Sequence, residues 1–379
     1  MRILLDDNPL APSNIPPSDS ESAYAARPAW IAASQGTEPP EVSAYRLQFN
    51  LPQSAVMRIH VSADERYRLY LDGQRIGCGP ERGSDCAWFY ETYELDLDAG
   101  PHSFVALVWR LGEIGPLAQI SLQWGFLLEA EGHLGNLVST KSAPWEAKNV
   151  EGISFSLPSI ARRGAWFVEP NQTTDGAVYP WEIELGQGQG WEAVTARRED
   201  FGLPFGIQAR HILKPAALPA QISDVRSGGR VRYVSGRAWE DAESIEIFKR
   251  DYLADEVGSW QAMLDGSEPV VIPAHSQRQV VLDLAQYVCA YPQIQVSGGE
   301  NSRLSMGWAE ALYLDGSGRV KGQRDEVEGK TFIALCNDEI LPDGGMGRQF
   351  EPLWWRAGRF ILLLVETDEQ PLTVEGFRL

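Results

Sequence analysis

Residues 321–366 decide the fold, and they read KGQRDEVEGK TFIALCNDEI LPDGGMGRQF EPLWWRAGRF ILLLVE. The apolar run at 361–365 has the length of a strand buried on both faces, although its periodicity alone also fits a buried helix. Residues 337–345 read as a loop ending on Asp-Gly-Gly, which predicts a tight turn because glycine reaches positive φ without steric cost. Trp354 and Trp355 cannot both face one core from a strand, since neighbouring side chains point to opposite faces. One of them is therefore expected to meet solvent, a sugar or another domain.

Outward from this stretch, short alternating strands predict an all-β chain. Met57, Ile59 and Val61 alternate with polar residues, as in a half-buried strand. Asp72-Gly73 is a strong hairpin signal, because a type I′ turn needs positive φ at both central positions. Residues 240–263 show helical spacing and are interpreted as a short helical insertion. Further strands are expected at 67–71, 103–111, 120–130, 231–234, 270–272, 280–282, 294–296 and 304–308.

These patterns predict two β-sandwich, jelly-roll-like domains in tandem, within the two or three domains that 379 residues suggest. We expect an extended N-terminal arm at 1–40 and a first, carbohydrate-binding-like sandwich at 41–215. The second sandwich is expected at 216–379. We expect the boundary in the segment that runs from His211 through Pro215 to Pro219.

Composition limits the classes of partner. A net charge of −19 argues against nucleic acid and against anionic membranes, which attract basic surfaces. Thirteen tryptophans suit neutral ligands that stack on aromatic rings, and sugars are the usual case, although core packing explains tryptophan equally well. The four cysteines, Cys78, Cys86, Cys289 and Cys336, lack zinc-site spacing. A bridge between Cys78 and Cys86 is one interpretation, and buried free thiols are the one we favour. The N-terminus lacks a signal-peptide pattern, which predicts a cytoplasmic protein, and we predict no metal and no cofactor.

Several motifs resemble the last β-sandwich before the catalytic domain of bacterial α-L-rhamnosidases, glycoside hydrolase family 78. The strongest are Lys-Gly-x-Arg-Asp-Glu-Val-Glu-Gly-Lys from Lys321 and Phe-x-Pro-Leu-Trp-Trp-Arg-x-x-Arg-Phe from Phe350. Weaker ones are Val-Leu-Asp-Leu from Val281, Met-Gly-Trp-Ala-Glu-Ala-Leu from Met306 and Pro-Phe-Gly-Ile-Gln-Ala-Arg from Pro204. In that family a helical toroid follows the β-domains and carries the catalytic carboxylates. The resemblance therefore implies a front portion of such an enzyme that lacks its catalytic domain.

Glycosidases need two carboxylates, one acting as acid and one as base. The sequence offers candidates near its end, but basic neighbours explain several of them as salt bridges or solvated charges. We therefore predict no catalytic residue in this chain. The candidates considered are Glu310, Asp325, Glu326, Glu328, Asp338, Glu339 and Asp343.

A sugar patch is one interpretation of Arg82, Trp88 and Tyr90, which follow or lie in a turn-rich, charged loop. Aromatic faces beside hydrogen-bonding charges are what a hydroxyl-rich ring needs. The other interpretation, which we favour for the aromatic residues, is an ordinary core strand.

Trp354, Trp355, Arg356 and Arg359 are interpreted as a face that docks onto the catalytic domain that the resemblance implies. Without that domain the face should be exposed. Arg356 is expected either to stack on a tryptophan or to pair with an acid such as Asp338.

The sequence thus predicts the non-catalytic N-terminal portion of an α-L-rhamnosidase-like glycoside hydrolase. It would support the downstream catalytic domain and bind rhamnosylated glycans. The alternative is a free-standing, lectin-like carbohydrate-binding protein.

Overall fold

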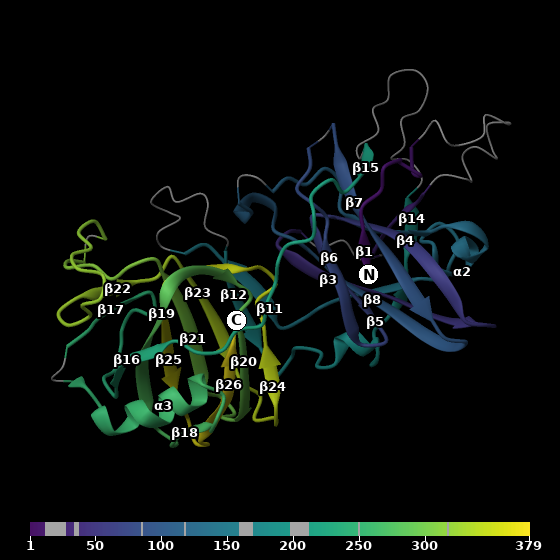
Figure 1. Ribbon diagram of the computed structural model, residues 1–379. Coiled ribbons are helices and arrows are strands. Elements are labelled where there is room, and N and C mark those ends of the chain that lie inside the picture. Colours follow the sequence, from purple (N-terminus) through teal and green to yellow (C-terminus); the bar gives the residue numbers. More distant parts are fainter. Residues whose placement is uncertain are drawn as a thin grey trace. The chain divides into compact units, whose positions relative to one another are not determined.

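The computed structural model describes residues 1–11, 28–33, 38–84, 86–116, 119–158, 170–197, 212–248, 251–316 and 318–379. Within these residues the chain is all-β, as predicted, and divides into two compact units (Figure 1). The first unit comprises Met1–Glu151 and Pro180–Ile222, and the second comprises Gly152–Tyr179 and Ser223–Leu379. Residues 152–179, which fall in the range expected for the first sandwich, therefore belong to the second unit.

Two mainly antiparallel sheets build the first unit, and their facing sides share one apolar core that includes Ile59 and Tyr45. One sheet has the order β1 (Arg2–Ile3), β7 (Trp88–Leu97), β4 (Ala55–Asp64), β9 (Gly125–Ala130), β2 (Trp30–Ala32) and β14 (Thr195–Arg197), with β15 (Leu213–Pro215) parallel to β7. The other has the order β13 (Glu192–Ala193), β10 (Glu146–Asn149), β3 (Glu41–Leu51), β8 (Gly100–Arg110), β5 (Arg66–Leu71) and β6 (Gln74–Gly79). Short helical turns are η2 (Gly112–Ile114), η3 (Gly132–Leu134), α2 (Gly135–Val138) and η5 (Ile183–Leu185).

Local sequence explains these strands. Met57, Ile59 and Val61 on β4 face the core, because alternate side chains of a strand share one side. Asp72 and Gly73 join β5 to β6 with φ of 51° and 80°, so the predicted hairpin turn with two positive φ angles is confirmed.

The second unit is organised around a long mixed sheet. Its order is β11 (Ile153–Ser156), β12 (Asn171–Asp175), β23 (Cys336–Leu341), β21 (Arg303–Ala309), β25 (Arg356–Glu366), β19 (Gln277–Ala290) and β16 (Arg230–Ser235). A four-stranded sheet has the order β18 (Val270–Ile272), β26 (Leu372–Arg378), β20 (Gln293–Gly298) and β24 (Arg348–Phe350). A pair is formed by β17 (Ser244–Glu246) and β22 (Thr331–Ile333), and η7 (Ala254–Glu256) leads into α3 (Val257–Leu264), which contacts β16, β18 and β26.

The apolar run at 361–365 is the middle of β25 and lies between β21 and β19. Leu362 and Leu364 join the core cluster that contains Ile245 of β17 and Phe332 of β22. The alternate residues of the run are equally buried, so the prediction of a strand buried on both faces is confirmed.

Three sequence-based expectations were wrong in their boundaries. Residues 337–341 belong to the buried strand β23 rather than to a loop, because β21 and β12 supply backbone partners that the local sequence does not reveal. In the region expected to be helical, Ile245 lies in β17, and the α-helix begins only at Val257. The strand expected from Ile120 begins at Gly125.

Candidate functional site in the second unit

Asp283 is the centre of a charge cluster on β19. Its carboxylate accepts two hydrogen bonds from Arg359 of β25, with Nε–Oδ1 of 2.8 Å and Nη2–Oδ2 of 3.0 Å, and one from Arg232 Nη1 at 2.8 Å. Burial acts to raise the pKa of Asp283, but the hydrogen bonds from Arg359 and from the Ala285 amide outweigh it and hold the pKa below its ordinary value. Asp283 is 3% exposed, so the ionised carboxylate depends on these donors.

The same arginines attach the charged run at 321–330 to the sheet. Arg359 Nη2 donates to Asp325 Oδ1 at 2.8 Å, and Arg232 Nη2 donates to the Asp325 carbonyl at 2.6 Å. At the end of the run Lys330 is 1% exposed and donates to the carbonyl of Gln323, while burial lowers its pKa. A run that reads as a solvated surface segment is thus held at its middle and its end.

Asp283 also shapes the backbone of β19. Its Oδ1 accepts the amide of Ala285 at 2.8 Å, and Ala285 has a φ of +63°, which non-glycine residues rarely adopt. Pairing with β25 is regular up to Asp283 and resumes at Val288, so the residues between form a bulge. The bulge leaves Tyr287 53% exposed, although β19 is an inner strand of its sheet.

Beside this bulge lies a second, more exposed ion pair. Lys321 Nζ is 2.8 Å from Glu310 Oε1, and the two side chains are 37% and 41% exposed. Burial raises the pKa of Tyr287 and of Tyr313, and the Glu310 carboxylate raises both further. Tyr313 is fixed by reciprocal backbone hydrogen bonds with Thr331 of 2.9 and 2.7 Å.

The residues predicted as a docking face are more buried than expected. Arg356 donates to Asp338 through Nε at 2.7 Å and Nη2 at 2.6 Å, so pairing with Asp338, one of the two expected arrangements, is what the structure shows. Trp354 is only 9% exposed, because it lies in the bend before β25 rather than in a strand, and its ring centroid is 6.0 Å from that of Trp355. The expectation of an exposed face is therefore wrong for Trp354 and Arg356, while Trp355 and Arg359 are half-buried.

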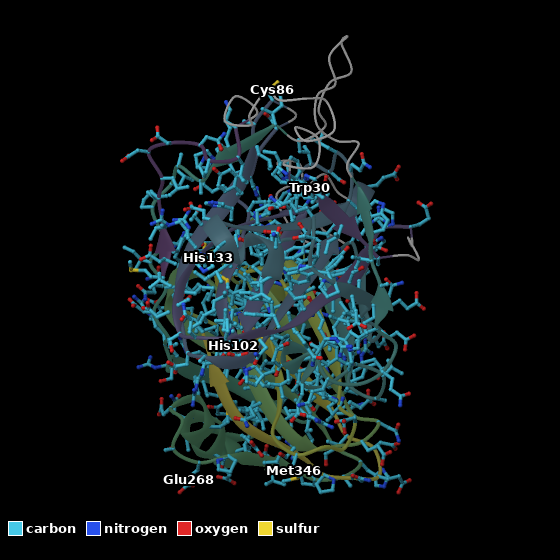
Figure 2. The ribbon with its side chains drawn as sticks, turned by 90° about the vertical axis from the view of Figure 1, so that its right-hand side faces the viewer. Trp30, Cys86, His102, His133, Glu268 and Met346 are labelled. Atoms are coloured by element: carbon cyan, nitrogen blue, oxygen red, sulfur yellow. The ribbon has the colours of Figure 1, made fainter. Side chains whose placement is uncertain are left out.

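The predicted sugar patch of the first unit is not assembled at the surface. Trp88 and Tyr90 are 3% and 0% exposed and pack with Trp30, whose indole is labelled in Figure 2, and with Leu213 of β15. The core interpretation thus describes both aromatic residues. Arg82 is exposed, so it does not share a ligand surface with their rings. Cover from β15, more than a hundred residues later in the chain, could not be seen in the local sequence.

The candidate carboxylates are mostly neutralised by basic partners. Ion pairs join Glu310 to Lys321, Asp325 to Arg359, Asp338 to Arg356, Glu339 to Arg303 and Asp343 to Arg348. Basic partners thus account structurally for these five carboxylates, and Glu326 and Glu328 are exposed.

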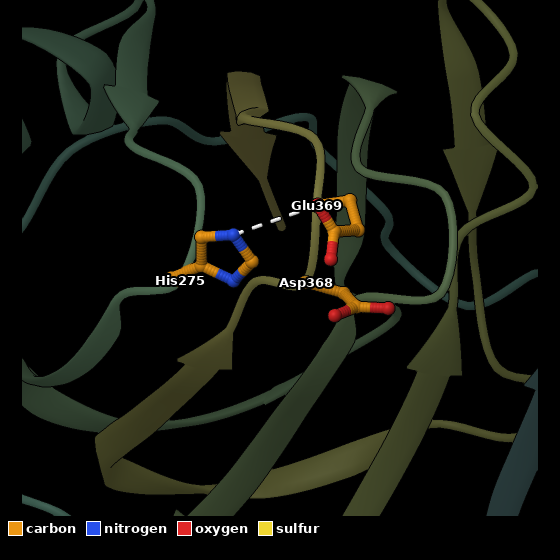
Figure 3. A group of neighbouring side chains, drawn as sticks. All are labelled: His275, Asp368 and Glu369. Carbon is orange, nitrogen blue, oxygen red and sulfur yellow. Dashed lines mark ion pairs between the residues drawn. The ribbon is translucent and has the colours of Figure 1, made fainter.

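One group of described residues could hold a divalent cation. His275, Asp368 and Glu369 lie on adjacent surface turns joined by the hydrogen bond from the His275 amide to the Asp368 carbonyl, 2.9 Å (Figure 3). Their ligand atoms lie within 4.8 Å of one another, and His275 Nε2 is 3.6 Å from Glu369 Oε2. The His275 and Glu369 side chains are 65% and 81% exposed, so ordinary surface charges account for the group.

The cysteine thiols and His60 are further reactive groups among the described residues. All four cysteines are thiols, but Cys78, Cys86 and Cys289 are exposed and Cys336 alone is buried, so the expectation of buried thiols was wrong for three of them. His60 is buried with Nδ1 3.0 Å from Thr92 Oγ1, and burial lowers its pKa to about 4. The helices in the described part of the chain are too short to span a bilayer.

Comparisons with known proteins give no match by sequence, either to a family model or to a curated protein. Solved structures do match. A family 78 rhamnosidase of Bacillus sp. GL1 aligns over 93% of this chain and 54% of its own, with a TM-score of 0.68 and 12% identity. An α-L-rhamnosidase from Aspergillus terreus aligns over 92% of this chain and 36% of its own, with a TM-score of 0.50 and 13% identity.

The resemblance to α-L-rhamnosidases is confirmed in the fold. This chain spans about half, or less, of the length of the rhamnosidases it matches. The motif beginning at Pro204 lies outside the described residues, whereas the motif residues Asp283, Asp325 and Arg359 meet at the bulge of β19, and Glu310 pairs with Lys321. The sequence contains these residues but does not reveal their convergence or the exposure of Tyr287. An aspartate directly after the apolar residues Val280–Leu282 was the available signal for a buried ion pair.

Proposed function

We propose that this chain is the non-catalytic β-portion of an α-L-rhamnosidase-like glycoside hydrolase, supporting a catalytic domain and holding rhamnosylated glycans. The fold match carries the proposal, since it covers 93% of this chain and only 54% of the Bacillus rhamnosidase. The ion pairs of the candidate carboxylates support the non-catalytic part, because basic partners within the chain already occupy oxygens of Glu310 and Asp338 that an acid–base pair would present to a glycoside.

The second unit supplies the support. Two arginine–aspartate pairs, Arg356 with Asp338 and Arg359 with Asp283, brace the inner strands β23, β25 and β19 against one another. Such charge-assisted, two-pronged hydrogen bonds fix geometry as well as adding energy. A rigid β-layer of this kind suits a unit on which a larger neighbour rests.

Release of rhamnose from an aryl α-L-rhamnoside tests the proposal. The purified chain is expected to release none, and an active rhamnosidase serves as the assay control. Release by the chain, abolished by Glu310→Gln, would refute the non-catalytic assignment.

The genomic sequence beyond the codon for Leu379 provides an independent test. A reading frame that continues into a long helical domain supports the proposed role. A stop codon there contradicts it and favours the free-standing carbohydrate-binding protein.

A further inference from the structure

Charged side chains hold the bulge in β19, whose residue Ala285 has a positive φ. Asp283 fixes the positive φ of Ala285 through its amide, while Arg359 and Arg232 hold Asp283 in turn. Backbone strain of this kind persists only where the surroundings enforce it, and bulges commonly redirect a side chain. Ala285, Gln286 and Tyr287 are all exposed in this bulge, and Tyr287 is the aromatic residue among them.

An ion pair lies on the same region of the sheet as Tyr287. Glu310 and Lys321 form a half-exposed pair that leaves lone pairs and N–H groups available to solvent. Tyr287 precedes Val288, which pairs with Gly358 of β25, and Glu310 follows Ala309, which pairs with Phe360 of β25. Tyr287 and Glu310 therefore lie at the same level of the sheet, on the two strands that flank β25. Cys289, two residues after Tyr287, is also exposed.

We propose that Tyr287, Glu310 and Lys321 form a subsite that binds a neutral pyranose ring. The apolar face of the sugar stacks on the Tyr287 ring, and its hydroxyls hydrogen-bond to the Glu310 carboxylate and the Lys321 ammonium. The choice of sugar class rests on the proposed function. A net charge of −19 disfavours an anionic ligand, and a charged pair at the centre of the patch disfavours a dry protein contact.

Saturation-transfer NMR with methyl α-L-rhamnopyranoside and methyl α-D-glucopyranoside tests the subsite on the full chain. We expect binding of at least one glycoside, weakened about three- to tenfold by Tyr287→Ala and largely kept by Tyr287→Phe. Tyr252→Ala is the matched control, since Tyr252 is a 37% exposed tyrosine of the same unit outside the patch. Absence of signal from both glycosides, or equal signal in Tyr287→Ala, overturns the proposal.

Cys289 gives a second readout that needs no substitution. The rate at which iodoacetamide alkylates each cysteine is followed by peptide mass spectrometry with and without the glycoside. Protection of Cys289, with exposed Cys78 and Cys86 unchanged, is expected. Equal rates at Cys289 with and without glycoside contradict the subsite. A lost subsite leaves the rhamnose-release result untouched, so failure of this inference and failure of the proposed function are separate observations.

Discussion

Arg356 and Arg359 lie three residues apart on β25, and each donates two hydrogen bonds to one aspartate. The surroundings of the two pairs differ. The Arg356 and Asp338 side chains are 2% and 5% exposed, and Arg356 also donates to the carbonyl of Pro170. Arg359 bridges the buried Asp283 to Asp325, whose side chain is 78% exposed. The same pairing chemistry therefore stabilises a buried contact at Arg356. At Arg359 it holds the bulge of β19 and the charged run at 321–330 together.

Removing Arg356 should have the largest effect. Arg356→Ala leaves the Asp338 carboxylate buried without its cation, and we expect the free energy of unfolding of the second unit to fall by about 3–5 kcal/mol. Urea denaturation followed by tryptophan fluorescence measures it. The double variant Arg356→Met with Asp338→Leu should lose less than Arg356→Ala, because no unpaired charge remains. A loss below about 1 kcal/mol in the single variant would contradict a buried, energetically coupled pair.

Asp283→Asn comes next, with an expected loss of about 1.5–3 kcal/mol, the range for hydrogen bonds to charged groups. The charged run at 321–330 should also be released, so trypsin should cut after Lys321 or Arg324 sooner than in the wild type. Asp343→Asn is the control, because Asp343 pairs with Arg348 away from the bulge. Equal cleavage rates in the two variants would mean that Asp283 does not help to hold residues 321–330 on the sheet.

Acid should act on the Asp283 cluster specifically. Its folded-state pKa is depressed, so its contribution to stability is present above the unfolded value of about 4 and lost as pH falls through the lower folded value. The difference in unfolding free energy between wild type and Asp283→Asn should therefore shrink as pH falls from about 6 to below 4. A constant difference across that range would mean that Asp283 is not ionised in the folded protein.

The smallest effect is expected at the exposed pair. Glu310→Gln should change the unfolding free energy by less than about 1 kcal/mol, because a pair that is more than a third exposed is screened by water. Urea denaturation of this variant beside Arg356→Ala measures the contrast. A loss comparable to that of Arg356→Ala would give Glu310 a structural role in place of a surface one.

The sequence predicted what depends on local pattern. The alternation in β4, the Asp72-Gly73 hairpin and the double burial of 361–365 each follow from side chains that lie close together in the chain. Trp88 and Tyr90 were correctly favoured as core residues.

Contacts between residues far apart in the chain could not be predicted from local sequence pattern. Strand β23 was mistaken for a loop because Asn337, Asp338 and Glu339 have turn chemistry, and their buried position depends on β12 and Arg356. The bulge at Ala285 is held locally by Asp283, but the position of Asp283 depends on its bond to Arg359, 76 residues later, which the local sequence does not reveal. Candidate site residues were therefore identified singly, whereas their grouping required the fold.

Strand β12 has a consequence for synthesis on the ribosome. It pairs in parallel with β23, and the amide of Gln172 reaches the carboxylate of Asp338, 166 residues later. At about 5–20 residues per second, translation needs roughly 8–33 s to supply that partner. During this interval the sequence of the first unit, up to Ile222, is completed, whereas the partner strand β23 of residues 152–179 has not yet been synthesised. The nascent chain must carry β12 with only β11 as a partner until β23 is made, and a gene cut near Pro215 would separate these two strands from the sheet that they complete.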